Sequence, residues 1–352
     1  MVREVAKSIK AWLEEDTQIL CILGGPFVGK TWLATNAFDG NSHNNIELVD
    51  NVNSYEDFET IIKKKENHKR YVIVGRLLVK ECEKIAQSLV DEKSIKYVYV
   101  TPMTFNEFKI ALPKTYNLGE LDALKIYIQV GGLPEIAKKF FDTGDISKVR
   151  RRHTYLFEKL KGGLDYKEKQ IIDAVIVQEL SDNPGFTFRE ISVAAREREY
   201  GDSVNSLRDK GLIYKIDRFD YKKDSRMHKY KFIFYDIGMW STIYKKKSFD
   251  DDVMYSFLLR ELITYTLGKN YNIFYWVKQR AKAKVSIIIE KSMDKKAIII
   301  PVEIAKKENV IPRNVQSFQN IYKAAIPIYI NRPTDEMVED GEVIFNRLGN
   351  IT

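Results

Sequence analysis

The segment from Gly24 to Thr31 has residue types and a spacing that suit phosphate chemistry. It reads Gly-Gly-Pro-Phe-Val-Gly-Lys-Thr and fits the pattern G-x-x-x-x-G-K-[ST]. Glycines let the backbone wrap closely around a polyphosphate, so that N–H groups and a helix N-terminus point at the anion. Lys30 would reach the β- and γ-phosphates, and the Thr31 hydroxyl would hold Mg²⁺. The pattern predicts a nucleotide site formed by Gly24, Gly25, Pro26, Phe27, Val28, Gly29, Lys30, Thr31 and Trp32.

A second anchor for the metal is expected to be an acid at the end of a neighbouring apolar strand. The apolar run 46–49 ends at Asp50, whereas the run 71–74 ends in Gly75 and Arg76 and offers no carboxylate. Asp50 is therefore the candidate acid on the Mg²⁺ side. The alternative is that Asp50 only opens a turn, since Asp-Asn pairs are ordinary turn residues.

The residue after Asp50 is Asn51, where enzymes of this kind usually carry a glutamate that acts as general base. An amide can orient a water molecule but cannot accept its proton. We therefore take Lys30, Asp50 and Asn51 as the candidate catalytic residues. Tight nucleotide binding with slow hydrolysis is the hypothesis that follows.

Short apolar runs alternate with helical patterns between Thr17 and about Leu112. This alternation predicts a mainly parallel sheet covered on both faces by helices. The glycine-rich loop then lies at the carboxyl ends of the strands, where such sheets bind ligands. The expected strands are 18–23, 46–49, 71–74 and 97–100, and the expected helices are 30–38, 55–65 and 79–90.

The composition is that of an intracellular globular protein, which we expect to be cytoplasmic. The chain has 352 residues, of which 44% are hydrophobic, and its formal net charge is +8. No apolar run approaches the ~20 residues of a membrane span, so no membrane partner is expected. The two cysteines suggest a reducing compartment, and the four scattered histidines show no zinc-ligand spacing.

The pattern changes between Tyr166 and Tyr235, where helices are followed by two short strands. Helices are expected at 167–180, 187–196 and 202–210, the last ending at Gly211, and strands at 212–216 and 230–235. Three helices with a two-stranded wing predict the winged form of the helix-turn-helix. Winged helices bind DNA but also serve as protein-docking modules.

If this unit binds double-stranded DNA, the helix 202–210 is the recognition helix by topology. The loop between the two strands is rich in basic residues, although aspartates in the same segment make its charge mixed. Binding through this loop would weaken steeply with salt. The candidate contacts to DNA are Asn205, Arg208, Arg218, Lys222, Lys223, Arg226 and Lys229.

Taken in order, these landmarks resemble a family of AAA-type P-loop ATPases of archaea and bacteria. Its members carry a P-loop domain, a winged helix and a C-terminal domain like that of restriction endonucleases. Besides the phosphate loop, the segment 46–50 resembles the family's acid strand and 71–76 a later strand that the family ends in a small polar residue. The other matches are 101–108 to L-x-P-L-S-F-x-E-F, 131–135 to G-G-x-P-E, 231–238 to K-x-Y-F-x-D-x-G, and 275–276 to Y-W.

The resemblance implies an α/β fold, in which a P-loop parallel-sheet domain precedes a winged helix and a small α/β nuclease-like domain. The expected divisions are a P-loop core at 1–112, a helical lid or linker at 113–165, a winged helix at 166–247 and a degenerate nuclease-like domain at 248–352. Only a short stretch separates Lys30 from Asp50, so one strand-helix unit of the family is missing or shortened here.

The C-terminal segment departs from the family pattern in the acids that a nuclease needs to hold its metal. Lys284-Val285-Ser286 stands in place of E-V-D, Val302-Glu303-Ile304-Ala305 in place of E-V-K, and Tyr255 where a glutamate is common. Glu303 alone remains. We expect this segment to be inactive as a nuclease.

The resemblance and the loop together imply a protein that uses ATP and Mg²⁺. The expected function is ATP binding with hydrolysis, the nucleotide state controlling the binding of DNA or a protein partner. The alternative is a non-enzymatic DNA-binding or scaffold protein that uses ATP as a structural ligand. Homo-oligomers are implied by the resemblance, with an arginine finger among Arg76, Arg150, Arg151 and Arg152.

Overall fold

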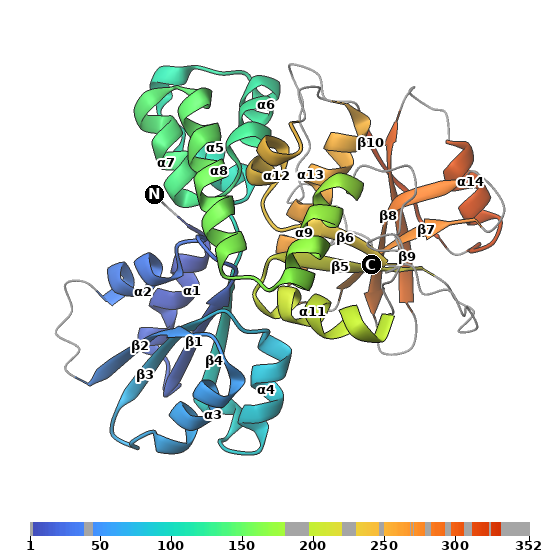
Figure 1. Ribbon diagram of the computed structural model, residues 1–352. Helices are drawn as coiled ribbons and strands as arrows, with labels where there is room; N and C mark the ends of the chain where they lie inside the picture. The colour runs from blue at the N-terminus through green and yellow to red at the C-terminus, as the bar shows by residue number, and fades with distance from the viewer. Residues whose placement is uncertain are drawn as a thin grey trace.

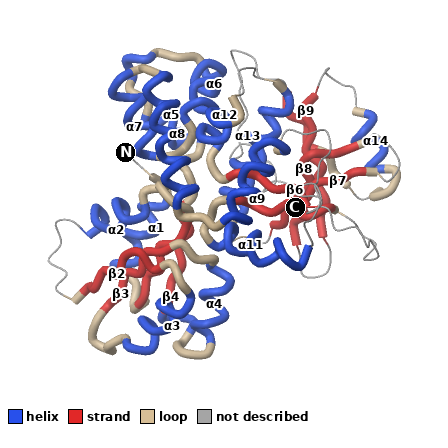
Figure 2. Tube along the Cα trace, viewed as in Figure 1, coloured by secondary structure: helices blue, strands red, loops and turns tan. Residues whose placement is uncertain are grey.

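The computed structural model describes residues 3–38, 45–179, 197–219, 230–245, 250–267, 269, 271–278, 283–292, 297–305, 312–323 and 325–331. An N-terminal sheet with its helices is followed by a helical unit and then by a second sheet (Figure 1). Figure 2 shows that the two sheets lie on different sides of the helices that connect them.

The N-terminal sheet is parallel, as the alternation of strands and helices predicts. Its strands are β1 (Ile19–Gly24), β2 (Ile46–Val52), β3 (Arg70–Gly75) and β4 (Ile95–Val100), in the order β2-β3-β1-β4. Every residue of β1 is buried, as expected for an inner strand covered on both faces. The strand β3 lies between the strand that leads into the glycine-rich loop and the strand that carries Asp50.

Alternate residues of β1 pack into two different cores, because side chains point to opposite faces along a strand. Leu20 and Ile22 belong to the larger core, which also includes residues of α1 (Val5–Ala11) and α2 (Lys30–Phe38). Ile19 and Cys21 pack with residues of α3 (Tyr55–Lys64) and α4 (Val79–Gln87). This packing fixes the start of α2 at the carboxyl end of the sheet.

A helical unit follows the first sheet and lies beside α12 (Ile237–Ile243) at the top of Figure 1. It consists of α5 (Phe105–Ala111), α6 (Glu120–Val130), α7 (Pro134–Thr143) and α8 (Ile146–Gly162), with a short 3₁₀ turn at Lys114–Tyr116. Gly144, at φ +62°, ends α7 and lets α8 turn back against it.

The second sheet has six strands in the order β10-β9-β8-β7-β5-β6. The expected hairpin is present as β5 (Ile213–Arg218) and β6 (Tyr230–Phe234), which pair antiparallel. Two helices precede it, α9 (Tyr166–Gln178) and α11 (Glu197–Asp209). The expected helix 187–196 lies outside the described residues.

The hairpin shares its sheet with the C-terminal strands. β5 pairs in parallel with β7 (Tyr271–Val277), through Asp217 with Phe274 and Arg218 with Tyr275. The expected division between 166–247 and 248–352 is therefore crossed by strand pairing. The remaining C-terminal elements are α13 (Asp251–Thr266), β8 (Lys284–Ser292), β9 (Ala297–Ala305), α14 (Arg313–Gln319) and β10 (Ile328–Asn331).

Among the helices that the structure describes, none is both long enough and apolar enough to cross a lipid bilayer.

Candidate functional site

The loop between β1 and α2 depends on backbone conformations that favour glycine. Gly24 has φ +149° and Gly29 has φ +87°. A Cβ atom at Gly24 would lie 2.1 Å from the carbonyl oxygen of Val100, so a side chain cannot be accommodated there. Phe27 adopts φ +61° without being glycine, which costs roughly 1–2 kcal/mol. Backbone strain of this kind concentrates at ligand-binding sites.

Lys30 is the first residue of α2, and its side chain folds back over the loop. Its Nζ donates to the carbonyl oxygens of Gly24 at 3.0 Å and Gly25 at 2.5 Å. Burial and, to a smaller extent, the nearby Arg76 lower the pKa of Lys30 to about 7, although Asp50 acts in the opposite direction. An anion bound at the loop would stabilise the charged form of this lysine.

Thr31 and Asp50 meet beside the loop, although they come from elements separated by β3. The Thr31 hydroxyl donates to Asp50 Oδ2 at 3.0 Å, and Asp50 Oδ1 accepts from the main-chain N–H of Asn51 at 2.7 Å. The pairing of β2 with β3 shifts register between Val49 and Val52, and Asn51 adopts φ +63°. This bulge orients the end of β2 so that the carboxylate of Asp50 reaches the start of α2.

Asn51 is exposed at the edge of the same site, next to Arg76. The Arg76 Nε donates to Asn53 Oδ1 at 3.0 Å, and the Arg76 main-chain N–H donates to the carbonyl of Val52 at 3.1 Å. A Cβ atom at Gly75 would lie 2.2 Å from that same carbonyl oxygen, so the ends of β2 and β3 are in close contact. Arg76 thus faces the site of its own chain.

These residues line a cavity of about 1030 Å³, large enough for a nucleotide. Of the residues expected from the sequence, Pro26, Phe27, Val28, Gly29, Lys30, Thr31, Trp32, Asp50 and Asn51 line it. Gly24 and Gly25 lie behind this wall, against Val100 and Gly211.

Three separate regions of the chain contribute to the cavity wall. The first is the N-terminal sheet with its loop, the second is α7 with α8, and the third is the turn after α11. Sequence reasoning missed the contributions of the last two regions to this site. The 131–135 segment was a usable signal for one of them, because it delivers Pro134 and Glu135 to the wall. The missed lining residues with polar side chains are Arg3, Asn53, Glu135, Lys138, Lys159 and Lys210.

The charged side chains that line the cavity are mostly basic. Among the described residues there are six basic ones, Arg3, Lys30, Arg76, Lys138, Lys159 and Lys210, and two acidic ones, Asp50 and Glu135. The carboxylate of Glu135 is paired with Arg152, whose Nε donates to it at 2.6 Å. Arg3, Lys138 and Lys210 are each paired with an acid outside the lining, namely Glu107, Asp142 and Glu168. The positive charge that remains, on Lys30, Arg76 and Lys159, suits a polyanionic ligand.

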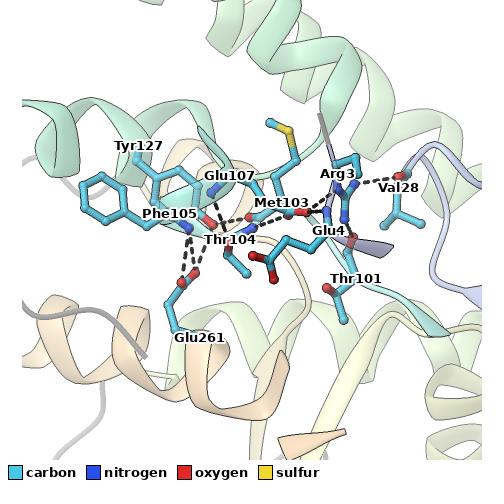
Figure 3. A network of polar contacts seen from close by, with 10 residues as sticks. All are labelled: Arg3, Glu4, Val28, Thr101, Met103, Thr104, Phe105, Glu107, Tyr127 and Glu261. Atoms are coloured by element: carbon cyan, nitrogen blue, oxygen red, sulfur yellow. Dashed lines mark hydrogen bonds and ion pairs between the residues drawn. The ribbon is translucent and has the colours of Figure 1, made fainter. Parts of the chain in front are cut away.

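A buried polar network fixes the loop from behind (Figure 3). The guanidinium of Arg3 donates to the Val28 carbonyl in the loop at 3.2 Å, to the Thr101 carbonyl at 2.8 Å and to Glu107 Oε1 at 3.1 Å. Glu107 in turn forms a capping box with Thr104 at the start of α5. The 101–108 segment therefore connects the loop to the helical unit.

The same network extends to the C-terminal part of the chain. The carboxylate of Glu261, in α13, accepts from the main-chain N–H of Phe105 at 3.2 and 3.1 Å, and Tyr127 lies against it (Figure 3). A second link joins Asp236 to the main-chain N–H of Gly132 at 2.8 Å. The segments 131–135 and 231–238, which are far apart in the sequence, are thus in direct contact.

Three of the candidate contacts to DNA, Asn205, Arg208 and Arg218, lie within the described residues. Asn205 is exposed on α11, and Arg208 lies 3.4 Å from it, while the Arg218 Nη2 donates to the Val277 carbonyl at 2.8 Å. Arg218 is therefore engaged in holding β5 to β7. Lys222, Lys223, Arg226 and Lys229 lie outside the described residues. The DNA contact stays a prediction.

The C-terminal acid Glu303 lies on β9, where Tyr255 from α13 contacts its carboxylate. The Tyr255 hydroxyl also accepts from the main-chain N–H of Ile304 at 2.9 Å. No group of three or more His, Cys, Asp or Glu side chains suited to a metal occurs in the part of the chain that the structure describes. Loss of nuclease activity stays a prediction.

The comparisons with known proteins leave the family of this chain open. No protein-family model matches the sequence, and no curated protein matches it. Among solved structures, the fold is similar to that of a Walker-type ATPase of Pyrococcus abyssi, with a TM-score of 0.44 and 11% sequence identity over 68% of this chain and 95% of that one. A likeness this distant says nothing about function, which depends on the residues of the cavity.

Proposed function

We propose that this protein binds ATP with Mg²⁺ in the cavity above the first sheet and hydrolyses it slowly. The observation that carries the proposal is the pairing of Thr31 with Asp50 beside Lys30, at the N-terminus of α2. A loop of this sequence, followed by a helix, presents main-chain N–H groups and an ammonium group to a triphosphate.

Thr31 and Asp50 would hold the metal ion. Their oxygens lie 3.0 Å apart at the cavity wall, and Mg²⁺ prefers oxygen ligands of this kind together with phosphate oxygens. The bound ion would neutralise charge on the terminal phosphates. Lys30 would provide the second positive charge from the opposite side of the loop.

Slow turnover is expected because both carboxylates that line the described part of the cavity are already engaged with other side chains, so neither is available to accept a proton from the attacking water. Among the described residues these are Asp50, which is engaged with Thr31, and Glu135, which is paired with Arg152. Asn51 stands where a general base would be useful, and its amide can only position a water molecule. The alternative, ATP as a structural ligand without turnover, differs from the proposal only in this step.

The nucleotide would also control a partner, because the cavity wall includes the turn after α11. That helix carries Asn205 and Arg208, the candidate contacts to DNA. If the nucleotide binds more tightly when α11 is in one position than in another, its binding shifts the helix toward the position with the tighter binding. Under this proposal, ATP changes the affinity of the protein for double-stranded DNA.

Calorimetric titration with ATP, in the presence and absence of Mg²⁺, tests the proposal together with an assay of phosphate release. We expect binding that Lys30→Ala weakens at least tenfold, with slow phosphate release that depends on Mg²⁺. Binding without any release would leave the structural-ligand alternative. No binding at about millimolar ATP, an affinity near −4 kcal/mol, would refute the proposed function.

A further inference from the structure

We propose that Lys210, at the end of α11, is a phosphate-contacting residue of the nucleotide site. This inference rests on the proposed function and deepens it. It adds a cation from the C-terminal half of the chain to a site whose sequence signature lies within the first 51 residues.

The main chain after α11 is in direct contact with the glycine-rich loop. A Cβ atom built on Gly25 would lie 2.7 Å from the carbonyl oxygen of Gly211, and one built on Gly211 would lie 2.7 Å from the Cα atom of Gly25. Gly211 also has φ +66°, a conformation that ends the helix and that other residues rarely adopt. Backbone therefore meets backbone, with no side chain between the loop and the turn.

This contact brings the residues on either side of Gly211 to the cavity. Lys210 and Leu212 both line it, together with the loop residues Phe27 to Thr31. The long, flexible side chain of Lys210 therefore starts at the same wall as the loop. It is 34% exposed, so rotation of its methylene groups would bring the ammonium group to a phosphate bound in the cavity.

A buried carboxylate fixes Lys210 in this position. Its Nζ is paired with Glu168 Oε1, and the side chain of Glu168 is only 3% exposed. Glu168 is itself held, because it accepts from the main-chain N–H of Asp165 at 3.0 Å and from the Ser206 hydroxyl at 2.6 Å. An ammonium group has three donors, so the bond to Glu168 leaves two that can meet phosphate oxygens.

The charge of the cavity points to the same type of ligand. Among the described lining residues, Lys30, Arg76 and Lys159 face one acid, Asp50, once the ion pairs with other residues are set aside, and a magnesium-bound triphosphate would offset part of this excess. A nucleotide held by both Lys30 and Lys210 would connect the first sheet to α11. This nucleotide-mediated link between the first sheet and α11 would be stronger for ATP than for ADP, and adenosine, which has no phosphate, would not form it.

The test compares the double variant Lys210→Met/Glu168→Gln with the parent protein. Removing both partners avoids leaving the buried carboxylate of Glu168 without a counter-charge. The matched control is Lys215→Met/Asp217→Asn, which removes an ion pair of 3.0 Å on β5, outside the cavity. Binding of ATP, ADP and adenosine is measured through the fluorescence of Trp32, which lines the cavity and is 49% exposed, while the other tryptophans are buried.

We expect the double variant to bind ATP at least tenfold more weakly, to bind ADP with a smaller loss, and to bind adenosine as the parent does. The control should match the parent within about twofold for all three ligands. Equal losses for all three ligands, or ATP affinity equal to that of the parent, would overturn the role of Lys210. Failure of the parent itself to bind ATP would refute the proposed function as well.

The single variant Glu168→Gln is expected to change ATP affinity in the opposite direction to the double variant. It removes the negative charge beside Lys210 and keeps an amide oxygen that can accept the same hydrogen bond, so we expect ATP affinity to rise severalfold while adenosine affinity stays constant. If the pair only stabilises the fold, this variant leaves the preference for ATP over adenosine unchanged, and the inference is overturned.

Discussion

The Thr31 hydroxyl lies 3.0 Å from the Asp50 carboxylate although a complete strand, β3, separates the strands that lead to them. Three local features bring the two side chains together. The glycine-rich loop places Thr31 in the first turn of α2, the bulge at Asn51 displaces the end of β2, and Gly75 lets the two strand ends approach closely. The proposed metal site depends on all three.

Replacing either of the two proposed Mg²⁺ ligands, Thr31 or Asp50, should lower the rate of Mg²⁺-dependent ATP hydrolysis. We expect Asp50→Asn and Thr31→Val to lower phosphate release at least a hundredfold, because the ion that neutralises the phosphates loses a ligand. Chelation of Mg²⁺ should reduce the parent to the same level. Phosphate-release assays over a range of Mg²⁺ concentrations check this.

An unchanged dependence on Mg²⁺ in both variants would place the metal elsewhere. Thr35→Val is a suitable control, because the Thr35 hydroxyl only donates to main-chain carbonyls within α2.

The pH dependence of ATP binding should report the state of Lys30. Its pKa is lowered to about 7 by burial, then by Arg76, so the free protein loses the charge above that pH. ATP favours the ammonium form, so binding above about pH 7 takes up a proton, and affinity falls by up to about tenfold per pH unit. Calorimetry in buffers of different ionisation enthalpy measures this uptake.

Lys30→Arg is the control for this titration, because a guanidinium keeps its charge throughout the range. Its ATP affinity should not depend on pH between about pH 7 and pH 9. The parent's free energy of unfolding should also rise relative to that of the variant over the same window, because its unfolded state binds more protons there. A parent protein whose affinity stays constant up to about pH 9 would contradict the assignment.

Introducing a carboxylate at the end of β2 should accelerate hydrolysis. Asn51→Glu supplies a group that can accept a proton from the attacking water, and general bases contribute roughly 10²–10⁴-fold. We expect phosphate release to increase at least tenfold, with ATP affinity changed little. Asn51→Gln, which matches the length without the charge, should leave the rate near that of the parent.

Rapid release by the parent protein, or no acceleration by Asn51→Glu, would show that another group already activates the water. Glu135 is the described lining residue that would then be tested by Glu135→Gln.

The ion pair of Arg3 with Glu107 should contribute to stability through its burial. Its side chains are 4% and 6% exposed, so Arg3→Met leaves a buried carboxylate without its partner. We expect a loss of about 3–5 kcal/mol, and a smaller loss for Arg3→Met/Glu107→Gln, because breaking one side costs more than replacing both. Urea unfolding measures both.

The exposed pair of Lys63 with Glu59 provides the comparison, and Lys63→Met should cost less than about 1 kcal/mol. Equal losses for Arg3→Met and Lys63→Met would indicate that the network of Figure 3 does not hold the loop.

Much of the first sheet could be predicted from the sequence. The expected helix at 30–38 matches α2 at both ends, because the glycine-rich loop fixes its start, and the strands are found within a few residues of the expected runs. The run 46–49 predicts β2, but not its continuation to Val52. That continuation depends on the left-handed conformation of Asn51. Asparagine tolerates this conformation, but its presence in a sequence does not predict it.

The remainder of the site depends on contacts between distant segments, which local patterns do not encode. Lys210 follows the loop by about 180 residues and reaches the cavity through the contact of Gly25 with Gly211. The ladder of β5 with β7 is short, with Asp217 and Arg218 as its paired residues and one more main-chain bond from Phe219 to Tyr275, and so short a pairing leaves no sequence signal. The sequence therefore predicts the two-stranded wing of a winged helix, and not its pairing with the C-terminal strands.

A crystal structure of the protein with Mg²⁺ and a non-hydrolysable ATP analogue would locate the nucleotide and the ion directly. We expect the triphosphate against the main-chain N–H groups of the loop from Gly25 to Lys30, with the ion bound by Thr31 and Asp50. A nucleotide located elsewhere, or a triphosphate in the cavity without contact to the loop, would contradict it.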